Sequence, residues 1–185
     1  MKLLYLTFTF LMIGSFALQS QNIYYTREAR IFFYSEAPLE DIEAHNNRGS
    51  SVIDFDNCEI ESSVLIRGFM FEKSLMQEHF NENYMESHKY PRATFKGTFV
   101  NCEEITIESD GTYPFIVEGE LEMREITGDV IAEGKIVVEN GQISGTAEFT
   151  VKVADFNIRI PALVRDNIAR EIDVRIEADY KKLDR

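Results

Sequence analysis

The sequence predicts an all-β protein built on one large antiparallel sheet with a single short helix. Three observations favour this fold class: hydrophobic residues from Ile23 onward recur with a period of two, glycines stand in turn-like pairs, and only one segment has helical periodicity. Roughly eight or more segments have the strand pattern. A sheet of that size buries its apolar side either against a second sheet or by closing into a barrel.

The N-terminus has the pattern of a secretory signal peptide. An almost wholly apolar run from Leu3 to Leu18 follows one positive charge, and the small residues Ala17 and Ser20 stand near its end. The run is shorter than the ~20 apolar residues that a bilayer span needs. We therefore expect residues 1–20 to be removed and residues 21–185 to form one periplasmic or secreted domain, without stable membrane insertion after cleavage.

Net charge restricts the class of partner. The formal charge is −13 at pH 7. An anionic surface repels nucleic acid and anionic membrane faces, so we expect no nucleic-acid partner. The same charge helps to keep a protein with an apolar load in solution.

Four segments show the strand pattern most clearly, with apolar residues and glycines on one face and charged or hydroxyl residues on the other. Such strands, joined by tight hairpins, are typical of an antiparallel sheet with one side in water. The apolar faces are Ala93, Phe95, Gly97 and Phe99; Phe115, Val117, Gly119, Leu121 and Met123; Ala147, Phe149, Val151 and Val153; and Ile172, Val174, Ile176, Ala178 and Tyr180. The expected turns are Arg48-Gly49, Asp110-Gly111, Gly128-Asp129 and Asn140-Gly141.

One segment has the pattern of an amphipathic helix. A capping-box pattern, Ser74-x-x-Gln77, marks its start, and Pro91 follows its end. We expect a helix from Leu75 to about Glu86, within a helical segment of about residues 74–88. Its apolar stripe is Met76, Phe80 and Tyr84, and its wet face is Glu78, Glu82 and Glu86.

The histidines of this segment do not predict a metal site. His79 and His88 are nine residues apart, whereas two ligands on one helix stand three or four residues apart. His79 with Glu82 would supply only two ligands. No G-x-S-x-G motif is present either. We expect no metal, no cofactor and no catalytic residues.

The chain resembles the YceI-like family over nearly the whole of residues 21–185. The matching core is Phe69-Met70-Phe71, then Leu75 to Glu86 with its His79-Phe80, then Tyr90-Pro91-x-Ala93-Thr94-Phe95-Lys96-Gly97. Ser35 to Ala44 and Phe149 to Pro161 match an early and a late pattern of the family. The chain departs from the family at Gly119-Glu120-Leu121-Glu122-Met123-Arg124-Glu125, where many members have roughly G-x-L-x-x-H-G, so a charged pair replaces a His-Gly turn.

This resemblance implies an exported, antiparallel eight-stranded lipocalin-like β-barrel, capped here by the segment of about residues 74–88. It also implies a lumen that binds a polyisoprenoid chain, such as an isoprenoid quinone, or a similar amphiphilic lipid. We expect a binding protein that sequesters or carries that lipid. The candidate ligand-binding residues are Val64, Ile66, Phe69, Phe71, Met76, Phe80, Tyr84, Phe95, Phe99, Phe115, Val117, Leu121, Met123, Phe149, Val151, Phe156 and Ile158.

Small residues on the apolar faces have two interpretations. Gly97, Gly119, Gly145 and Ala147 stand among phenylalanines, which suits a channel for a linear chain. Aromatic neighbours that fill the glycine gaps would instead give an ordinary packed core. The helix is correspondingly either a lid over a ligand or a segment that only seals the core.

The two cysteines, Cys58 and Cys102, are disulfide candidates. If Glu59–Phe69 and Arg92–Asn101 are antiparallel neighbours, the cysteines lie at the same barrel end, within the ~4.4–6.8 Å between Cα atoms that a bridge needs. An exported protein permits the bond. The alternative is two unpaired turn cysteines.

Two other functions stay open from the sequence. A barrel with a solid core would be a protein-interaction module of the cell envelope. A lipid-modifying enzyme would need a polar group in the lumen, and Asp155 and Arg159 are the nearest candidates. The oligomeric state is open as well, with a homodimer among the alternatives.

Overall fold

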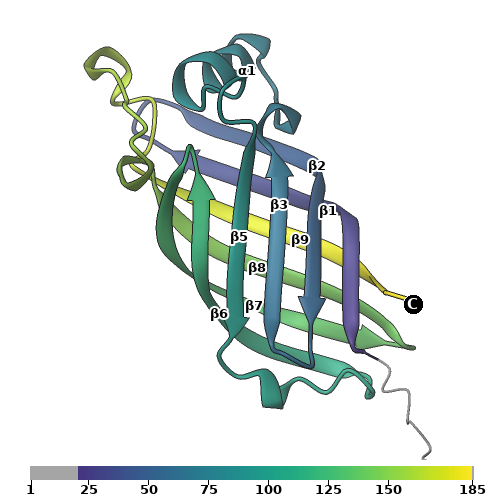
Figure 1. Ribbon diagram of the computed structural model, residues 1–185. Helices are drawn as coiled ribbons and strands as arrows, with labels where there is room; N and C mark the ends of the chain where they lie inside the picture. Colours follow the sequence, from purple (N-terminus) through teal and green to yellow (C-terminus); the bar gives the residue numbers. More distant parts are fainter. Residues whose placement is uncertain (1–20, 185) are drawn as a thin grey trace, which may run out of the picture.

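The structure is a computed structural model that describes residues 21–184. Its long strands close into a barrel in the order β1-β9-β8-β7-β6-β5-β3-β2, with β2 paired back to β1 (Figure 1). Every neighbouring pair in this ring is antiparallel. The predicted fold class, an eight-stranded lipocalin-like barrel with one short helix, is confirmed. The predicted signal peptide lies outside the described residues.

The elements have the following bounds. The barrel strands are β1 (Ile23–Glu36), β2 (Asp41–Asp54), β3 (Glu59–Leu65), β5 (Arg92–Phe99), β6 (Gly111–Met123), β7 (Ile126–Glu139), β8 (Gln142–Lys152) and β9 (Glu171–Lys182). A two-residue strand, β4 (Met70–Phe71), pairs with β2. The helix α1 (Ser74–His79) continues into a π-helical turn, Phe80–Tyr84, and short 3-10 turns occupy Ile66–Gly68, Cys102–Glu104, Val153–Phe156 and Ala162–Val164.

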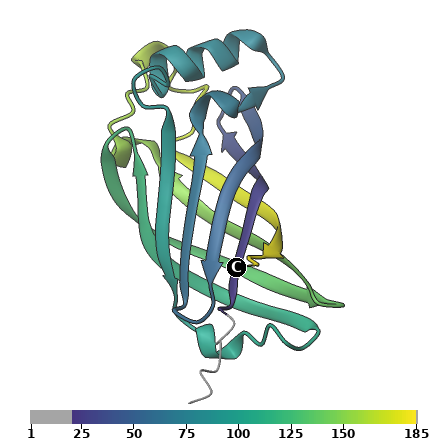
Figure 2. The same ribbon diagram turned by 45° about the vertical axis from the view of Figure 1, so that its right-hand side comes forward.

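The two ends of the barrel differ. At one, the capped end, α1 lies across the barrel opening beside the connection from β8 to β9, as both ribbon views show (Figures 1 and 2). At the other, the disulfide end, Cys58 and Cys102 are bonded, with their Cα atoms 5.7 Å apart. The strands that bring them together, β3 and β5, are antiparallel neighbours.

Two of the four expected turns lie inside strands, so those predictions are wrong. Arg48-Gly49 belongs to β2 and Gly128-Asp129 to β7. The chain instead turns from β6 to β7 at Arg124-Glu125, whose φ angles of 56° and 61° are those of a two-residue hairpin. Asn140-Gly141 turns as predicted, with φ of 51° and 76°, and Asp110-Gly111 ends a longer loop at the start of β6.

The glycines of these two wrongly predicted turns, Gly49 and Gly128, allow neighbouring segments to pack closely. A side chain at Gly49 would meet Ala29 and Ile31 at about 3 Å, where the pairing of β1 with β2 shifts register. A side chain at Gly128 would stand 3.0 Å from the ring of Phe156. These glycines therefore provide close approach and not a turn.

The helix begins without the predicted capping box. Ser74 is already its first residue, and no side chain caps it. The side-chain oxygen of Gln77 accepts a hydrogen bond from the backbone N–H of Phe71 at 3.3 Å. Gln77 thus joins the helix to β4 instead of closing a capping box.

The helical segment ends at Tyr84, earlier than the predicted limit near residue 88. The Asn81 side chain donates to the Gln77 carbonyl at 2.8 Å, a carbonyl that an ordinary helix would bond through the backbone. The backbone N–H of Met85 donates to the carbonyl of Phe80, which widens the last turn. Among residues 21–184, no helix has the length and apolar character needed to cross a bilayer.

Candidate functional site

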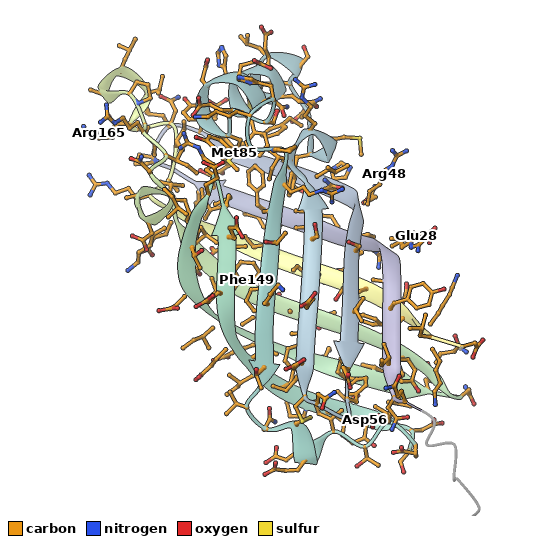
Figure 3. All side chains as sticks on the ribbon, viewed as in Figure 1. Glu28, Arg48, Asp56, Met85, Phe149 and Arg165 are labelled. Carbon is orange, nitrogen blue, oxygen red and sulfur yellow. A yellow bond between two sulfur atoms is a disulfide. The ribbon has the colours of Figure 1, made fainter. Side chains whose placement is uncertain are left out.

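The barrel encloses a cavity of about 410 Å³, a size typical of small-molecule sites. Each of the eight barrel strands and the helical cap contribute to its wall. It extends from Met76 and Phe80 under the cap to Phe99 and Tyr180, which belong to the core cluster beside the disulfide. In Figure 3, Met85 lies beneath the cap and Asp56 marks the opposite end of the barrel.

Side chains that point into the barrel are not all covered by protein. On the inward faces of β8 and β9, Ala147, Phe149 and Val174 line the cavity and are only half-buried. In a filled core, such positions would be buried at close packing. The lumen therefore keeps unfilled space beside β8 and β9, whereas Phe99, Phe115 and Tyr180 at the disulfide end are buried in a packed cluster.

The structure brings nearly all of the candidate ligand-binding residues to this one cavity. They reach it from β3, the 3-10 turn and β4 that follow it, the cap, β5, β6, β8 and the connection after β8. The residues that line it are Val64, Ile66, Phe69, Phe71, Met76, Phe80, Tyr84, Phe95, Phe99, Phe115, Val117, Leu121, Met123, Phe149, Val151 and Ile158.

Phe156 is the exception and does not line the cavity. It is buried, and its ring covers Gly128 on β7. The expectation from the family pattern is wrong for this residue, because it lies in a 3-10 turn that places its ring against β7. Its role is to fix the connection after β8 against the barrel wall.

Sequence reasoning missed most of the wall that β1 and β9 supply. Alternation predicts the apolar face of β9, but the predicted ligand-binding residues include none from this strand. In β1, register shifts on both sides of Ala29 hide the alternation from the sequence. The missed residues include Ala29, Ile31, Phe33, Ile172, Val174, Ile176, Ala178 and Tyr180.

The glycines of the apolar faces divide between the two interpretations. The ring of Phe95 lies within 2.8 Å of where a Cβ would stand at Gly97 and at Gly119, so an aromatic side chain fills both gaps. Gly145 and Ala147 line the cavity instead. The barrel is thus packed on the β5–β6 side and open on the β8 side.

Four phenylalanines close the lumen under the cap. The ring of Phe80 lies 5.0 Å from Phe71, 5.5 Å from Phe33 and 5.7 Å from Phe69, between ring centroids. All four line the cavity. Aromatic pairs at these distances contribute about 0.5–1.5 kcal/mol each beyond area burial. The Phe80 side chain therefore attaches the helical segment to the barrel wall.

A cluster of hydroxyl groups interrupts the apolar wall. The Ser62 Oγ donates to the Ser51 Oγ at 2.9 Å, and the Tyr180 hydroxyl lies 3.1 Å from the same atom. Burial raises the pKa of Tyr180 to about 12. The wall of the lumen is mostly apolar, and this cluster is a buried place where a polar group of a ligand could find a hydrogen-bond partner. Ser63, Thr94 and Thr146 add further hydroxyl groups to the wall.

At the capped end, the edge of the cavity beside Glu40 is formed by loops. Here the β1–β2 turn meets the connection from β8 to β9, since the Leu39 N–H donates to the Asp166 carbonyl at 3.0 Å and Glu40 pairs with Lys73 at 2.8 Å. The hydrogen bond from Lys73 lowers the pKa of Glu40. Glu40 itself lines the cavity. Three separate segments thus frame this edge.

Arg124 joins three other segments of the capped end. Its guanidinium pairs with Glu86 after the helical segment and donates to the Asn157 carbonyl at 2.7 Å. It also lies 5.6 Å from the ring centre of Tyr90. The charged turn that departs from the family pattern therefore fastens the cap and does not line the lumen.

The residues considered for catalysis lie outside the cavity. Asp155 and Arg159 are exposed, and neither lines it. The expectation that these were the nearest lumenal polar groups is wrong: Asp155 lies in the 3-10 turn Val153–Phe156, Arg159 follows that turn, and both are exposed to solvent. Within residues 21–184, no three His, Cys, Asp or Glu side chains are grouped to hold a metal ion.

With this geometry in place, the chain can be compared with known proteins. Residues 26–180 match the family model of the YceI-like domain. The chain belongs to the YceI-like family. No curated protein sequence matches this YceI-like chain.

Solved structures share the fold of this YceI-like barrel at low sequence identity. A polyisoprenoid-binding domain from Saccharophagus degradans, implicated in plant cell wall breakdown, has a TM-score of 0.73 and 11% identity, with 88% of this chain and 99% of that one covered. BcnA from Burkholderia cenocepacia has a TM-score of 0.68 and 13% identity, covering 83% and 96%. The YceI protein of Campylobacter jejuni has a TM-score of 0.52 and 16% identity, covering 75% and 85%.

Proposed function

We propose that this YceI-like protein sequesters or carries a long-chain isoprenoid, or a similar amphiphilic lipid, in its barrel lumen. The observation that carries the proposal is the cavity of about 410 Å³, which extends from the cap to Tyr180 between apolar walls. A lumen of this shape fits a linear hydrocarbon chain. A barrel used only as a protein-interaction module would have no need of such a space.

The energetics of burial support a ligand held by its chain. Each buried CH₂ group contributes ~0.8 kcal/mol, so ten such groups contribute roughly 8 kcal/mol before the costs of association. Affinity then depends on chain length. Selectivity for a head group or a polar substituent falls to the few polar residues of the wall, with the Ser51, Ser62 and Tyr180 hydroxyls first among them.

Family membership supports the same ligand class, because one solved structure with this fold is a polyisoprenoid-binding domain. We include no catalytic step in the proposal. Within residues 21–184, the lumenal hydroxyls of Ser51, Ser62 and Tyr180 hydrogen-bond to one another and to no acidic or basic side chain. Binding without turnover is therefore the function that the wall chemistry favours.

Export is part of the proposal. The leader of residues 1–20 has the signal-peptide pattern, and the Cys58–Cys102 bond suits an oxidising compartment. The N-terminus of the mature protein, read by mass spectrometry from cell-envelope and cytoplasmic fractions, tests this part. Recovery in the envelope fraction with a start near Gln21 is expected, and full-length chain in the cytoplasm would contradict it.

A solvent extract of the purified protein tests the ligand. The extract is analysed by mass spectrometry and quantified against protein concentration. A long-chain isoprenoid or similar lipid in a near one-to-one ratio is expected. An extract free of lipid would favour the interaction module instead.

A further inference from the structure

The strongest surface feature outside the lumen is a short segment at the capped end, Arg159-Ile160-Pro161-Ala162-Leu163-Val164-Arg165, called the rim segment below. It belongs to the connection between β8 and β9 and includes the 3-10 turn Ala162–Val164. Its two faces differ in what they contact. Ile160 and Val164 line the cavity, while Leu163 is 94% exposed.

The exposed side chain of Leu163 contributes little to the stability of the fold. A leucine contributes to the fold by leaving water, and this one stays almost wholly in water. Leu39, 72% exposed, belongs to the neighbouring β1–β2 turn, which the Leu39 N–H bonds to the Asp166 carbonyl at 3.0 Å. Two exposed leucines therefore stand on adjoining loops at an edge of a hydrocarbon-lined cavity.

The charge of the rim segment is opposite to that of the chain. The chain has 32 acidic and 19 basic residues and as a whole is repelled by an anionic surface. The rim segment, between Asp155 and Asp166, has two arginines and no carboxylate, so attraction to such a surface is confined to this segment. Among residues 21–184, neither Arg159 nor Arg165 has a carboxylate within salt-bridge distance. Figure 3 shows Arg165 on the outer side of this connection.

We infer that the rim segment docks the protein on a lipid bilayer that contains anionic phospholipid. Leu163, supported by Leu39, enters the interface, and Arg159 and Arg165 contact phosphate groups, in the manner of interfacial anchors. Basic side chains close to an anionic surface are attracted to it over about a Debye length. Docking in this orientation places the cavity edge formed by Ile160 and Val164 against the source of the lipid.

A bilayer fits these features better than a protein partner does. The apolar contact is a single protruding leucine with its neighbour and not a broad flat patch, so it suits insertion between lipids more than a protein interface. The flanking arginines complement phosphate groups on both sides of it. The inference deepens the proposed carrier function, since it names the surface from which the lipid is taken or to which it is delivered.

Vesicle co-sedimentation tests the inference. The protein begins at Gln21, so that the apolar leader contributes nothing; the barrel itself is built from Ile23 onward. Vesicles of phosphatidylcholine with phosphatidylglycerol are compared with phosphatidylcholine alone. We expect binding to the mixed vesicles that weakens with added salt. Leu163→Asp and the double change Arg159→Glu with Arg165→Glu should each reduce it about tenfold or more.

Ile131→Asp is the matched control, because Ile131 is an exposed aliphatic residue, 61% exposed, on β7. It should bind vesicles as the unchanged protein does. Failure of the unchanged protein to sediment, or equal loss in Ile131→Asp and Leu163→Asp, would overturn the inference.

The lipid content of the same preparations separates this inference from the proposed function. Bound lipid without vesicle binding removes the docking and leaves the carrier. Vesicle binding that depends on Leu163, with a lipid-free extract, upholds the docking and removes the carrier.

Discussion

The Phe80 ring lies 5.0 Å from the Phe71 ring, so a residue of the helical cap packs directly on β4, the two-residue strand that pairs with β2. Phe33 and Phe69 surround the same ring. The cap is thus attached by aromatic contacts that also form part of the cavity wall. A ligand in the lumen would contact the side chains that hold the cap in place.

Replacing Phe80 with aspartate should release the bound lipid. A carboxylate in this aromatic cluster loses its hydration, and the cap moves outward to restore it. We expect lipid retention to fall at least about tenfold, because the loss of the buried ring should weaken the free energy of lipid binding by more than about 1.4 kcal/mol. Lipid content per protein after dilution and gel filtration measures it.

Leu75→Asp is the control for this change. Leu75 is on the same helix, is 61% exposed and does not line the cavity. It should retain lipid like the unchanged protein. If folded Phe80→Asp protein also retained its lipid, the helical segment would not be a lid.

Narrowing the lumen should reduce the amount of lipid that the protein binds. Ala147 faces the cavity from β8 and is only half-buried, so a larger side chain there can extend into unfilled space with modest strain. We expect Ala147→Phe to fold with near-unchanged stability and to hold less lipid. Ile131→Phe places the same ring on the outside of the barrel and should not alter lipid content. Equal lipid content in both variants would mean that the ligand does not pass Ala147.

Removal of the Cys58–Cys102 bond should destabilise the barrel. The bond closes a loop between residues 44 apart in sequence, for which the chain-entropy model gives about 4 kcal/mol. Urea unfolding of a Cys58→Ser, Cys102→Ser double variant measures the difference. Two free thiols per chain in the untreated protein would contradict the bond itself.

Stability should fall at alkaline pH because of Tyr180. Burial raises its pKa from 10.0 to about 12, so the unfolded chain loses this proton at lower pH than the folded protein does. The contribution is fully present below pH 10 and is lost as the pH rises to about 12, by roughly 3 kcal/mol. Unfolding free energies across this window should show the loss, and Tyr180→Phe should remove that part of it. The exposed Tyr34→Phe is the control and should leave the loss in place.

The sequence was sufficient for the strands that alternate without interruption. In β5 and β6, inward and outward residues follow the pleat from end to end, so Phe95, Phe115 and Leu121 could be assigned to the lumen. The same reasoning predicted that Cys58 and Cys102 lie at one end of the barrel, on the condition that β3 and β5, which flank the cap in sequence, are antiparallel neighbours.

The remaining wall could not be predicted because local pattern and tertiary pairing disagree there. Buried positions in β2 change from even to odd numbers between Asn46 and Gly49, where the strand bulges against β1. The dipeptide Arg48-Gly49 therefore has the sequence pattern of a turn although it lies inside β2. At the two irregular turns, Phe156 packs on Gly128 and Phe80 packs on Phe33, contacts between distant residues that periodicity does not record.

Native mass spectrometry of the exported protein, purified without detergent, is the most direct test of a lipid-filled lumen. We predict a main species heavier than the bare chain by the mass of one long-chain lipid, converted to the bare mass on solvent extraction. A single species at the mass of the bare, disulfide-bonded chain, unchanged by extraction and by incubation with an isoprenoid quinone, would contradict the account.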